Sequence, residues 1–355
     1  MIPEHRPTRL PVFLASALSK LYSIGINHQN RKFDRGDGVT TLDRPVISIG
    51  NLSTGGTGKT PLVQHVVRLL IEAGHHPAIA MRGYKAKSGE IGDEQREHMD
   101  SLPGVPIVAQ PDRIAGLLKL FATDEGKRVD CVVLDDGFQH RKIARDLEIV
   151  VIDASRPPYG DALLPLGFLR ESAESLERTD VVVISHAEMV EQEALGELRN
   201  WVARRVRAET IVSVVTHRWD RIVEYNCDGE RVAEHPVERV LDEQVAVLTG
   251  IGHPEAFVSM AVAEGAKISH RSDRPDHDDF SRSVVDEFLD DARVAGASAI
   301  LTTNKDWTKL KTRLKRENSD GVQLDVMPVL IPGLGLGFQS GESDLKSACM
   351  RVFES

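Results

Sequence analysis

A glycine-rich stretch near residue 50 has the residue types that bind phosphate. The sequence VISIGNLSTGGTGKTPL (46–62) places Gly55, Gly56 and Gly58 directly before Lys59 and Thr60. Glycines let backbone N–H groups close around phosphate oxygens, and the N-terminus of a following helix adds partial positive charge. Lys59 would reach the β- and γ-phosphates, and the Thr60 hydroxyl would bind Mg²⁺. The stretch therefore predicts a binding loop for a nucleoside triphosphate.

The loop departs from the strict GxxxxGK[ST] pattern at one position. Ser53 stands where that pattern has its first glycine, whereas the GGTGKT core is intact and is similar to variant loops of another branch of P-loop enzymes. The alternative is a glycine-rich turn with a surface lysine, but an apolar strand before it and a helix after it favour phosphate binding. The predicted nucleotide-binding residues are Ser53, Thr54, Gly55, Gly56, Thr57, Gly58, Lys59 and Thr60.

A pair of carboxylates follows a second apolar run. In VDCVVLDDGFQH (129–140), Asp135 and Asp136 come at the carboxyl end of a predicted buried strand. An acid that orients Mg²⁺ belongs at this place in nucleotide-binding α/β folds. A helix cap or turn would explain one aspartate, but not two beside a phosphate loop.

The elements that must position these residues alternate along the chain. Apolar runs typical of buried strands alternate with helical patterns, which predicts an α/β fold with a parallel sheet. TPLVQHVVRLLIEAG (60–74) reads as a helix that ends at Gly74. The predicted buried strands are Val46–Ile49, Ala78–Met81, Cys131–Leu134, Ile149–Ile152 and Val181–Ile184.

The pattern changes after residue 210. Residues 211–231 alternate at strand period and contain an Asp228-Gly229 turn signal, which predicts a β-hairpin. Strand-to-helix units then return, whereas IPGLGLGF (331–338) is expected to be a loop. The predicted domains are an N-terminal helix and lead-in (1–44), a P-loop lobe (45–210), a hairpin linker (211–240) and a smaller α/β lobe (241–355).

Composition excludes several classes of protein. The 355 residues are 41% hydrophobic and 28% charged, as in an ordinary globular protein, and the formal net charge of -10 disfavours broad nucleic-acid binding. The three cysteines lie far apart in the sequence, so neither a disulfide framework nor a zinc site is expected.

The N-terminal segment RLPVFLASALSKLYSIGI (9–26) is apolar but interrupted by Lys20. It is too short and too polar for a membrane span. On a helix its apolar side chains share one face, opposite three serines. That face either lies in a membrane interface or packs on the protein core, and the residues alone favour the core. The apolar face comprises Leu14, Ala17, Leu18, Leu21 and Ile24, and the serines are Ser16, Ser19 and Ser23.

An ordered set of motifs resembles the tetraacyldisaccharide 4'-kinases, the lipid A 4'-kinases. After the phosphate loop come MRGYKAKSG, GDE, DDGFQHRKIARDLEIVVID, LLPLGFLRE, TGIGHPEAF, PDHDDFS and TNKDWTKL, so the resemblance covers about residues 46–310. It implies that Mg²⁺ and ATP are used to phosphorylate the 4'-hydroxyl of a tetraacylated glucosamine disaccharide 1-phosphate. Because that lipid stays in the bilayer, the resemblance also implies a peripheral protein on the cytoplasmic face of the inner membrane, and it favours the membrane interpretation of the N-terminal helix. No obligate protein partner is inferred.

The resemblance also implies residue roles. The acid of the GDE motif, Asp93, would be the catalytic base, oriented by His277 of PDHDDFS. From its residue type alone Asp93 would be a turn or cap residue, and His277 a solvated side chain. Thr60 with Asp135 or Asp136 would hold the metal.

Four further side chains are candidates for binding. Glu171 is a candidate for metal binding or substrate positioning, and Lys59 with Arg82 or Arg113 would neutralise phosphoryl charge. Lys305 either contacts the nucleotide or begins a helix.

Several positions depart from the usual family pattern, among them Lys85, which stands where a glycine commonly follows the tyrosine. Asn304 replaces the glutamate of TEKD, and Phe168 and Ser172 replace prolines. The family usually has two adjacent histidines here. This chain retains the first, His277, and has Asp278 in place of the second. These departures affect substrate tuning more than the reaction.

Two other functions compete with a lipid kinase. The main alternative is a membrane-associated P-loop ATPase switch, which would hydrolyse ATP without an acceptor lipid. A lipid-binding protein that retains nucleotide affinity would bind without turnover, but intact Lys59, Thr60 and Asp93 disfavour it.

Overall fold

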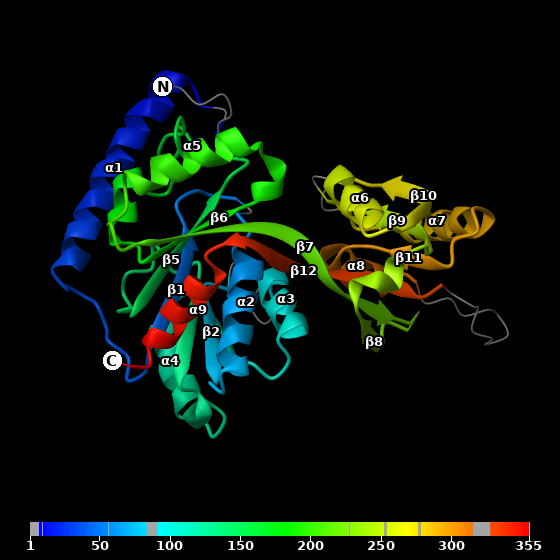
Figure 1. Cartoon of the computed structure of the whole chain (residues 1–355), viewed down its shortest axis with the longest axis horizontal. Coiled ribbons are helices and arrows are strands. Elements are labelled where there is room, and N and C mark those ends of the chain that lie inside the picture. Colours follow the sequence, from blue (N-terminus) through cyan, green and yellow to red (C-terminus); the bar gives the residue numbers. More distant parts are fainter. Residues whose placement is uncertain are drawn as a thin grey trace. The chain divides into compact units, whose positions relative to one another are not determined.

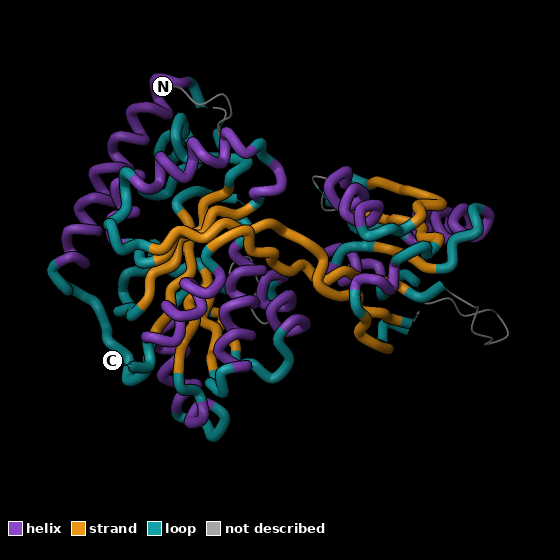
Figure 2. The backbone as a smooth tube through the Cα atoms, viewed as in Figure 1, coloured by secondary structure: helices purple, strands orange, loops and turns teal. Residues whose placement is uncertain are grey.

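The computed structural model describes residues 7–8, 10–55, 57–83, 91–226, 228–251, 254–275, 278–314 and 327–354, with only the backbone of Asp93. The chain divides into two compact units. Unit 1 takes the residues up to His217 and those from Leu336 on, and unit 2 takes Arg218–Gly335. Figures 1 and 2 show the elements of each unit.

Unit 1 is built on a parallel sheet with the strand order β7-β6-β5-β1-β4-β2-β3. The α/β fold with a parallel sheet is thus confirmed, and every predicted buried strand is present. The strands are β1 (Val46–Asn51), β2 (Pro77–Met81), β3 (Ile107–Ala109), β4 (Cys131–Asp135), β5 (Leu147–Asp153), β6 (Val181–Ser185) and the first part of β7 (Ile211–Tyr225).

Both faces of this sheet are covered, which is why its strands are continuous apolar runs. Helices α2 (Lys59–Glu72) and α9 (Glu342–Arg351) pack on one face, and α3 (Asp93–Ser101) lies beside α2. The other face carries α4 (Arg113–Phe121) and α5 (Gln192–Ala203). All the strands end at the same edge, where the phosphate loop follows β1.

The parallel strands of unit 2 follow the order β10-β9-β11-β12. Its strands are β9 (Gln244–Thr249), β10 (Lys267–Asp273), β11 (Ala299–Leu301) and β12 (Val329–Ser340), and its helices are α6 (Pro254–Ala263), α7 (Arg282–Val294) and α8 (Asn304–Leu310). The predicted hairpin is present, because β8 (Arg231–His235) pairs antiparallel with the end of β7. Short 3-10 helices lie at Gly126–Arg128, Ala173–Arg178, Ala187–Met189 and Val237–Val240.

Two sequence-based expectations about the C-terminal part of the chain were wrong. The stretch IPGLGLGF lies within β12 rather than in a loop. Its glycines allow close packing, since a Cβ on Gly335 would stand 2.6 Å from the Cβ of Asp220. The smaller lobe also does not run to residue 355, because residues from Leu336 on belong to unit 1. Leu345 and Cys349 of α9 are fully buried in the core that includes β1 and α2.

The N-terminal helix α1 (Val12–Asp34) packs through its less apolar side. Ala15 and Ser19 are buried, whereas Phe13, Leu21 and Ile24 are 77%, 65% and 66% exposed. The expectation from the residues alone, that the apolar face packs on the core, was therefore wrong. Among the described residues, no helix has the length and apolarity that a membrane span requires.

Candidate active site

The phosphate loop connects β1 to the N-terminus of α2. Gly58 begins the helix with a φ of 75°, in the left-handed region that favours glycine. A Cβ on Gly58 would stand 2.6 Å from Nε2 of His217, so both backbone conformation and space require glycine here. The loop therefore has the strand–glycine–helix context that phosphate binding needs.

Ser53 fits the loop without the glycine of the strict pattern. It forms an isolated antiparallel bridge with Leu169 and is not among the described residues with positive φ. The N–H group of Thr54 donates to the carbonyl of Phe168 at 2.8 Å. An extended chain, rather than a tight glycine turn, thus enters the loop.

Lys59 lies between the last residue of β1 and an acid that directly follows β4. Its ammonium donates to Oδ1 of Asn51 at 3.1 Å and pairs with Asp136 at 3.5 Å. Asn51 in turn donates to Oγ1 of Thr57 at 3.0 Å and to the carbonyl of Ser53 at 2.6 Å. Asn51 thus fixes both the loop and the position of the lysine.

Asp136 is surrounded by positively charged side chains at this site. It has a φ of 53°, and Nη1 of Arg170 donates to its two carboxylate oxygens at 2.8 and 2.7 Å. Arg113 donates to its backbone carbonyl at 3.3 Å. Although burial opposes ionisation, the charges of Lys59 and Arg170 hold the pKa of Asp136 below its usual value. The aspartate is therefore ionised at neutral pH.

Asp135 is bonded to a buried histidine. Nε2 of His98 on α3 lies 2.9 Å from Oδ2 of Asp135, and both side chains are buried. Burial raises the pKa of the neighbouring Glu97 to about 7. Helix α3 thus brings ionisable side chains to the end of β4.

Replacing Glu97 with glutamine should stabilise the protein at alkaline pH. The folded state holds the Glu97 proton up to about pH 7, whereas the unfolded chain releases it near 4.5. The free energy of unfolding therefore falls as the pH rises from about 4.5 to about 7. Above pH 7 the whole of this loss is present. We expect Glu97→Gln to unfold at higher urea than the native protein at pH 8, by about 2 kcal/mol, and equally at pH 4. A Glu72→Gln control should not differ at either pH, and a variant less stable at pH 8 would contradict the expectation.

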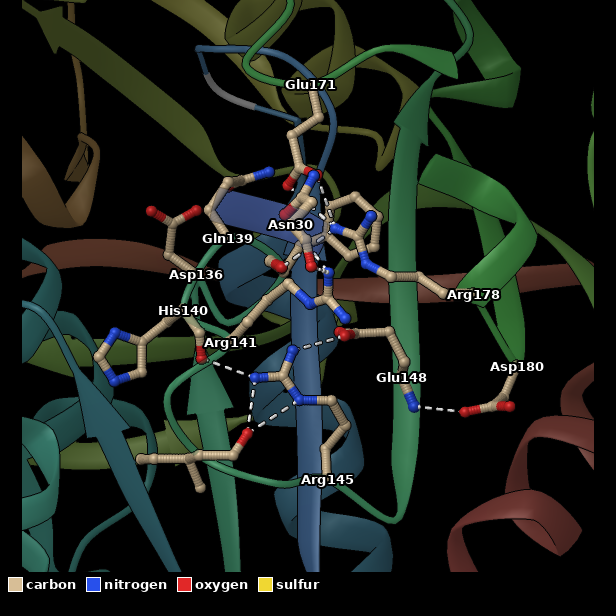
Figure 3. A network of polar contacts seen from close by, with 12 residues as sticks. Asn30, Asp136, Gln139, His140, Arg141, Arg145, Glu148, Glu171, Arg178 and Asp180 are labelled. Carbon is tan, nitrogen blue, oxygen red and sulfur yellow. Dashed lines mark hydrogen bonds and ion pairs between the residues drawn. The ribbon is translucent and has the colours of Figure 1, made fainter. Parts of the chain in front are cut away.

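A buried polar network lies beneath the site (Figure 3). Glu171 accepts from Nη2 of Arg178 at 2.8 Å and from Nδ2 of Asn30 on α1 at 2.8 Å. Arg145 pairs with buried Glu148 at 2.7 Å. Because its carboxylate is engaged by an arginine and an amide, Glu171 has the contacts of a structural residue, and a metal role for it stays a prediction.

An Arg145→Met variant should be destabilised by about 3 kcal/mol, because it leaves the Glu148 carboxylate buried without its cation. Adding Glu148→Met removes that charge and should recover part of the loss. Urea unfolding of the native, single and double variants measures both effects. A double variant as unstable as the single one would show that the other bonds of Arg145, to the carbonyls of His140 and Ile143, carry the stability instead.

The structure brings together some of the predicted residues but not all. Lys59, Asp136 and Arg113 are connected by the contacts above, and Thr60 lies in the first turn of α2. Arg82 is exposed just after β2. Gly56, His277 and the side chain of Asp93 lie outside the described part of the chain, although α3 begins at Asp93. Their predicted roles stay predictions.

One predicted binding residue, Lys305, lies in unit 2. Lys305 is half-buried in the first turn of α8, and its predicted contact with the nucleotide stays a prediction. The neighbouring Asp306 accepts from the N–H of Gly250 at 3.0 Å and from the Thr303 hydroxyl at 2.8 Å. Asp306 therefore serves the local structure at the start of this helix.

Sequence reasoning missed three side chains of the site. Asn51 lies in the same motif as Lys59, and Arg170 lies in the same motif as Glu171. Membership of these motifs was the feature of the sequence that could have indicated a role for them. His98 gives no signal in one sequence, since only the fold shows that it is buried against Asp135.

Comparison with known proteins gives a consistent result. A family model described as Tetraacyldisaccharide-1-P 4'-kinase matches residues 12–332. The chain belongs to the tetraacyldisaccharide 4'-kinase family. This confirms the expected family, and with it the activity of a lipid A pathway kinase. The match starts at the first residue of α1, so the family model includes that helix.

Named relatives and a solved structure agree with the family. A tetraacyldisaccharide 4'-kinase of Anaeromyxobacter sp. (strain K) is 35% identical over 79% of this chain and 76% of its own. One from Geobacter metallireducens is 33% identical over 87% of this chain and 91% of its own. The structure resembles that of LpxK from Aquifex aeolicus in complex with ATP, with a TM-score of 0.69, 28% identity and coverage of 95% and 98% of the two chains.

Proposed function

We propose that this family member transfers the γ-phosphate of ATP to the 4'-hydroxyl of a tetraacylated disaccharide 1-phosphate, with Mg²⁺. The observation that carries the proposal is the convergence of Lys59 of the phosphate loop on Asp136 at the end of the neighbouring strand. ATP in the complex of the Aquifex aeolicus protein supports the choice of nucleotide. A switch needs no acceptor, and the family match favours the kinase over it.

The side chains at the loop suit Mg²⁺. Thr60, Asp135 and Asp136 offer a hydroxyl and two carboxylates, and Mg²⁺ prefers oxygen ligands of this kind. We assign Thr60 with one of the two aspartates to the metal. When bound, Mg²⁺ would neutralise charge on the phosphates and orient them.

Positively charged groups of the chain itself would also stabilise the phosphates. Lys59 stands at the N-terminus of α2, where the helix dipole and backbone N–H groups also favour negative charge. Arg170 and Arg113 hold Asp136 in place through its carboxylate and its carbonyl. Lys59 and the N-terminus of α2 would stabilise the charge of the migrating phosphoryl group without rearrangement, while the two arginines keep Asp136 in position.

The acceptor hydroxyl needs a base, because a sugar alcohol is a poor nucleophile at neutral pH. Asp93 is assigned to accept its proton, and His277 to orient Asp93. The backbone places Asp93 at the start of α3, the helix that also carries His98 to Asp135. This placement on the same helix supports the assignment of Asp93.

We assign the exposed face of α1 to the cytoplasmic surface of the inner membrane. Phe13, Leu21 and Ile24 are large apolar side chains in water, and a helix with such a face binds in a bilayer interface. The acceptor has acyl chains, so an enzyme at that surface reaches it without extracting it. This peripheral location is part of the proposal.

A Leu21→Ser/Ile24→Ser variant should bind phospholipid vesicles at least about 10-fold more weakly. Each substitution removes an apolar side chain whose burial contributes about 1.5–3 kcal/mol. Vesicle co-sedimentation measures the change. A matched control is Val294→Ser, which alters an exposed side chain on α7. Equal binding by all three proteins would overturn the assignment of the membrane surface to α1.

The kinase proposal is tested by ATP turnover with and without the acceptor. ATP consumption that requires the lipid disaccharide, and yields one phosphorylated lipid per ADP, supports the kinase. Turnover at the same rate without any lipid would overturn it and favour the switch.

A further inference from the structure

Residues 161–171, named here the strap, run between α1 and the phosphate loop. On the loop side, the N–H of Arg170 donates to the carbonyl of Leu52 at 2.7 Å, and the carbonyl of Phe168 accepts from the N–H of Thr54 at 2.8 Å. The strap is internally tight, since Oδ1 of Asp161 accepts from the N–H of Phe168 at 3.1 Å. Any displacement of the strap therefore reaches the phosphate loop.

The other side of the strap is held by one stripe of α1. Oγ of Ser19 donates to the carbonyl of Leu163 at 2.9 Å, and the hydroxyl of Tyr22 donates to the carbonyl of Arg170 at 3.0 Å. Asn30, two turns further along the helix, donates to Glu171 at 2.8 Å, as Figure 3 shows. Three polar side chains at helical spacing thus bind the strap.

Two of the three strap residues that are bonded to α1, Arg170 and Glu171, are also held by other parts of the fold. The N–H of Arg170 donates to the carbonyl of Leu52, and its carbonyl accepts from the Tyr22 hydroxyl. Its guanidinium donates to the two carboxylate oxygens of Asp136 at 2.8 and 2.7 Å. Glu171, the next residue, is fixed from both sides by Asn30 and Arg178. A chain of hydrogen bonds thus connects α1 through Arg170 to the Asp136 carboxylate.

We infer that Tyr22 and Asn30 are positioning residues of the kinase: through Arg170 they set the Asp136 carboxylate for Mg·ATP. This goes beyond an anchoring role for α1 and rests on the proposed function, in which Asp136 serves the Mg·ATP site. The opposite face of α1 is free to lie on a lipid surface, so one helix combines surface binding with support of the phosphate site. Burial, followed by the charge of Glu171, raises the pKa of Tyr22, which keeps its hydroxyl protonated as a donor.

The test compares two double variants of the full chain. Tyr22→Phe/Asn30→Ala removes the two bonds, and Asn27→Ala/Gln29→Ala alters exposed polar residues of the same helix as a matched control. Binding of a fluorescent ATP analogue is titrated with Mg²⁺ and repeated with EDTA, and thermal unfolding is recorded. This readout uses no lipid.

We expect Tyr22→Phe/Asn30→Ala to need about 10-fold more Mg²⁺ for half-maximal ATP binding, because a misplaced carboxylate binds the metal complex poorly. Its binding in EDTA should match the native protein, and the control should match it throughout. An unchanged Mg²⁺ requirement, or equal weakening with and without Mg²⁺, would overturn the inference and leave only a structural role. The inference would also be overturned if ATP binding by the native protein did not depend on Mg²⁺. A native protein that binds Mg·ATP but does not phosphorylate lipid would instead refute the proposed function.

Discussion

A Lys59→Met variant should phosphorylate the acceptor about 10³-fold more slowly than the native protein. The side chain keeps its length but loses the charge that stands at the helix N-terminus beside Asp136. In the proposed reaction, that charge stabilises the migrating phosphoryl group more strongly in the transition state than in bound ATP, so the loss is expected in kcat. Single-turnover transfer from γ-labelled ATP measures it.

The fold should tolerate this substitution. Asp136 keeps its bidentate contact with Arg170, so no buried carboxylate loses its last cation. A Lys127→Met variant, altered at an exposed lysine, is the control and should retain full activity. A loss of less than 10-fold for Lys59→Met, with normal folding, would remove Lys59 from the chemistry.

The second large effect is expected at Asp93. An Asp93→Asn variant keeps the shape of the side chain but cannot accept the proton of the acceptor hydroxyl, and we expect kcat to fall about 10³-fold. Its affinity for Mg·ATP should stay within about twofold, because Lys59 and Thr60, the side chains proposed to bind the nucleotide, are unchanged. Asp100→Asn, altered at an exposed position of the same helix, should behave like the native protein. Normal turnover by Asp93→Asn would require another base.

A double-mutant cycle tests whether His277 acts through Asp93. If the imidazole orients the carboxylate, His277→Ala costs activity in the native background but little more in Asp93→Asn. Independent, multiplying losses would show that the two residues do not work as a unit, and would reopen the question of Asp278, which stands where the family usually has a second histidine.

The sheet was predictable because its strands are buried on both faces. Runs such as 131–134 and 181–184 carry apolar side chains without alternation, which is the signature of a covered parallel strand. Strand β12 lacks that signature because it contains several glycines. These glycines leave room for the close approach of Asp220, which depends on the fold and not on the local sequence. The packing of α9 in unit 1 could not be predicted from the sequence either, because it depends on long-range contacts of Leu345 and Cys349.

Helix α1 shows a different limit of pattern reading. Its hydrophobic stripe was identified correctly, but the side that packs is chosen by hydrogen bonds of Ser19, Tyr22 and Asn30 to one distant segment. A periodicity argument assigns apolar side chains inward and has no means of foreseeing polar contacts that lie more than a hundred residues apart.

The site was predicted where local geometry determines it. Lys59 and Asp136 follow from a strand–loop–helix motif and a strand end, so they meet as expected. Arg170 and His98 reach the site from other elements, and their contacts with Asp136 and Asp135 depend on the assembled fold. One sequence shows which residue types are present, but not which of them the fold brings to the phosphate.

The central claim is transfer of the γ-phosphate to one hydroxyl of a lipid disaccharide. The most direct measurement incubates the native protein with γ-labelled ATP, Mg²⁺ and detergent-dispersed tetraacylated disaccharide 1-phosphate, and locates the label in the purified lipid by mass spectrometry and phosphorus NMR. We predict one new phosphate, on the 4'-oxygen, appearing about 10³-fold more slowly with Asp93→Asn. Label released only as inorganic phosphate, or found on another oxygen of the sugar, would contradict the account.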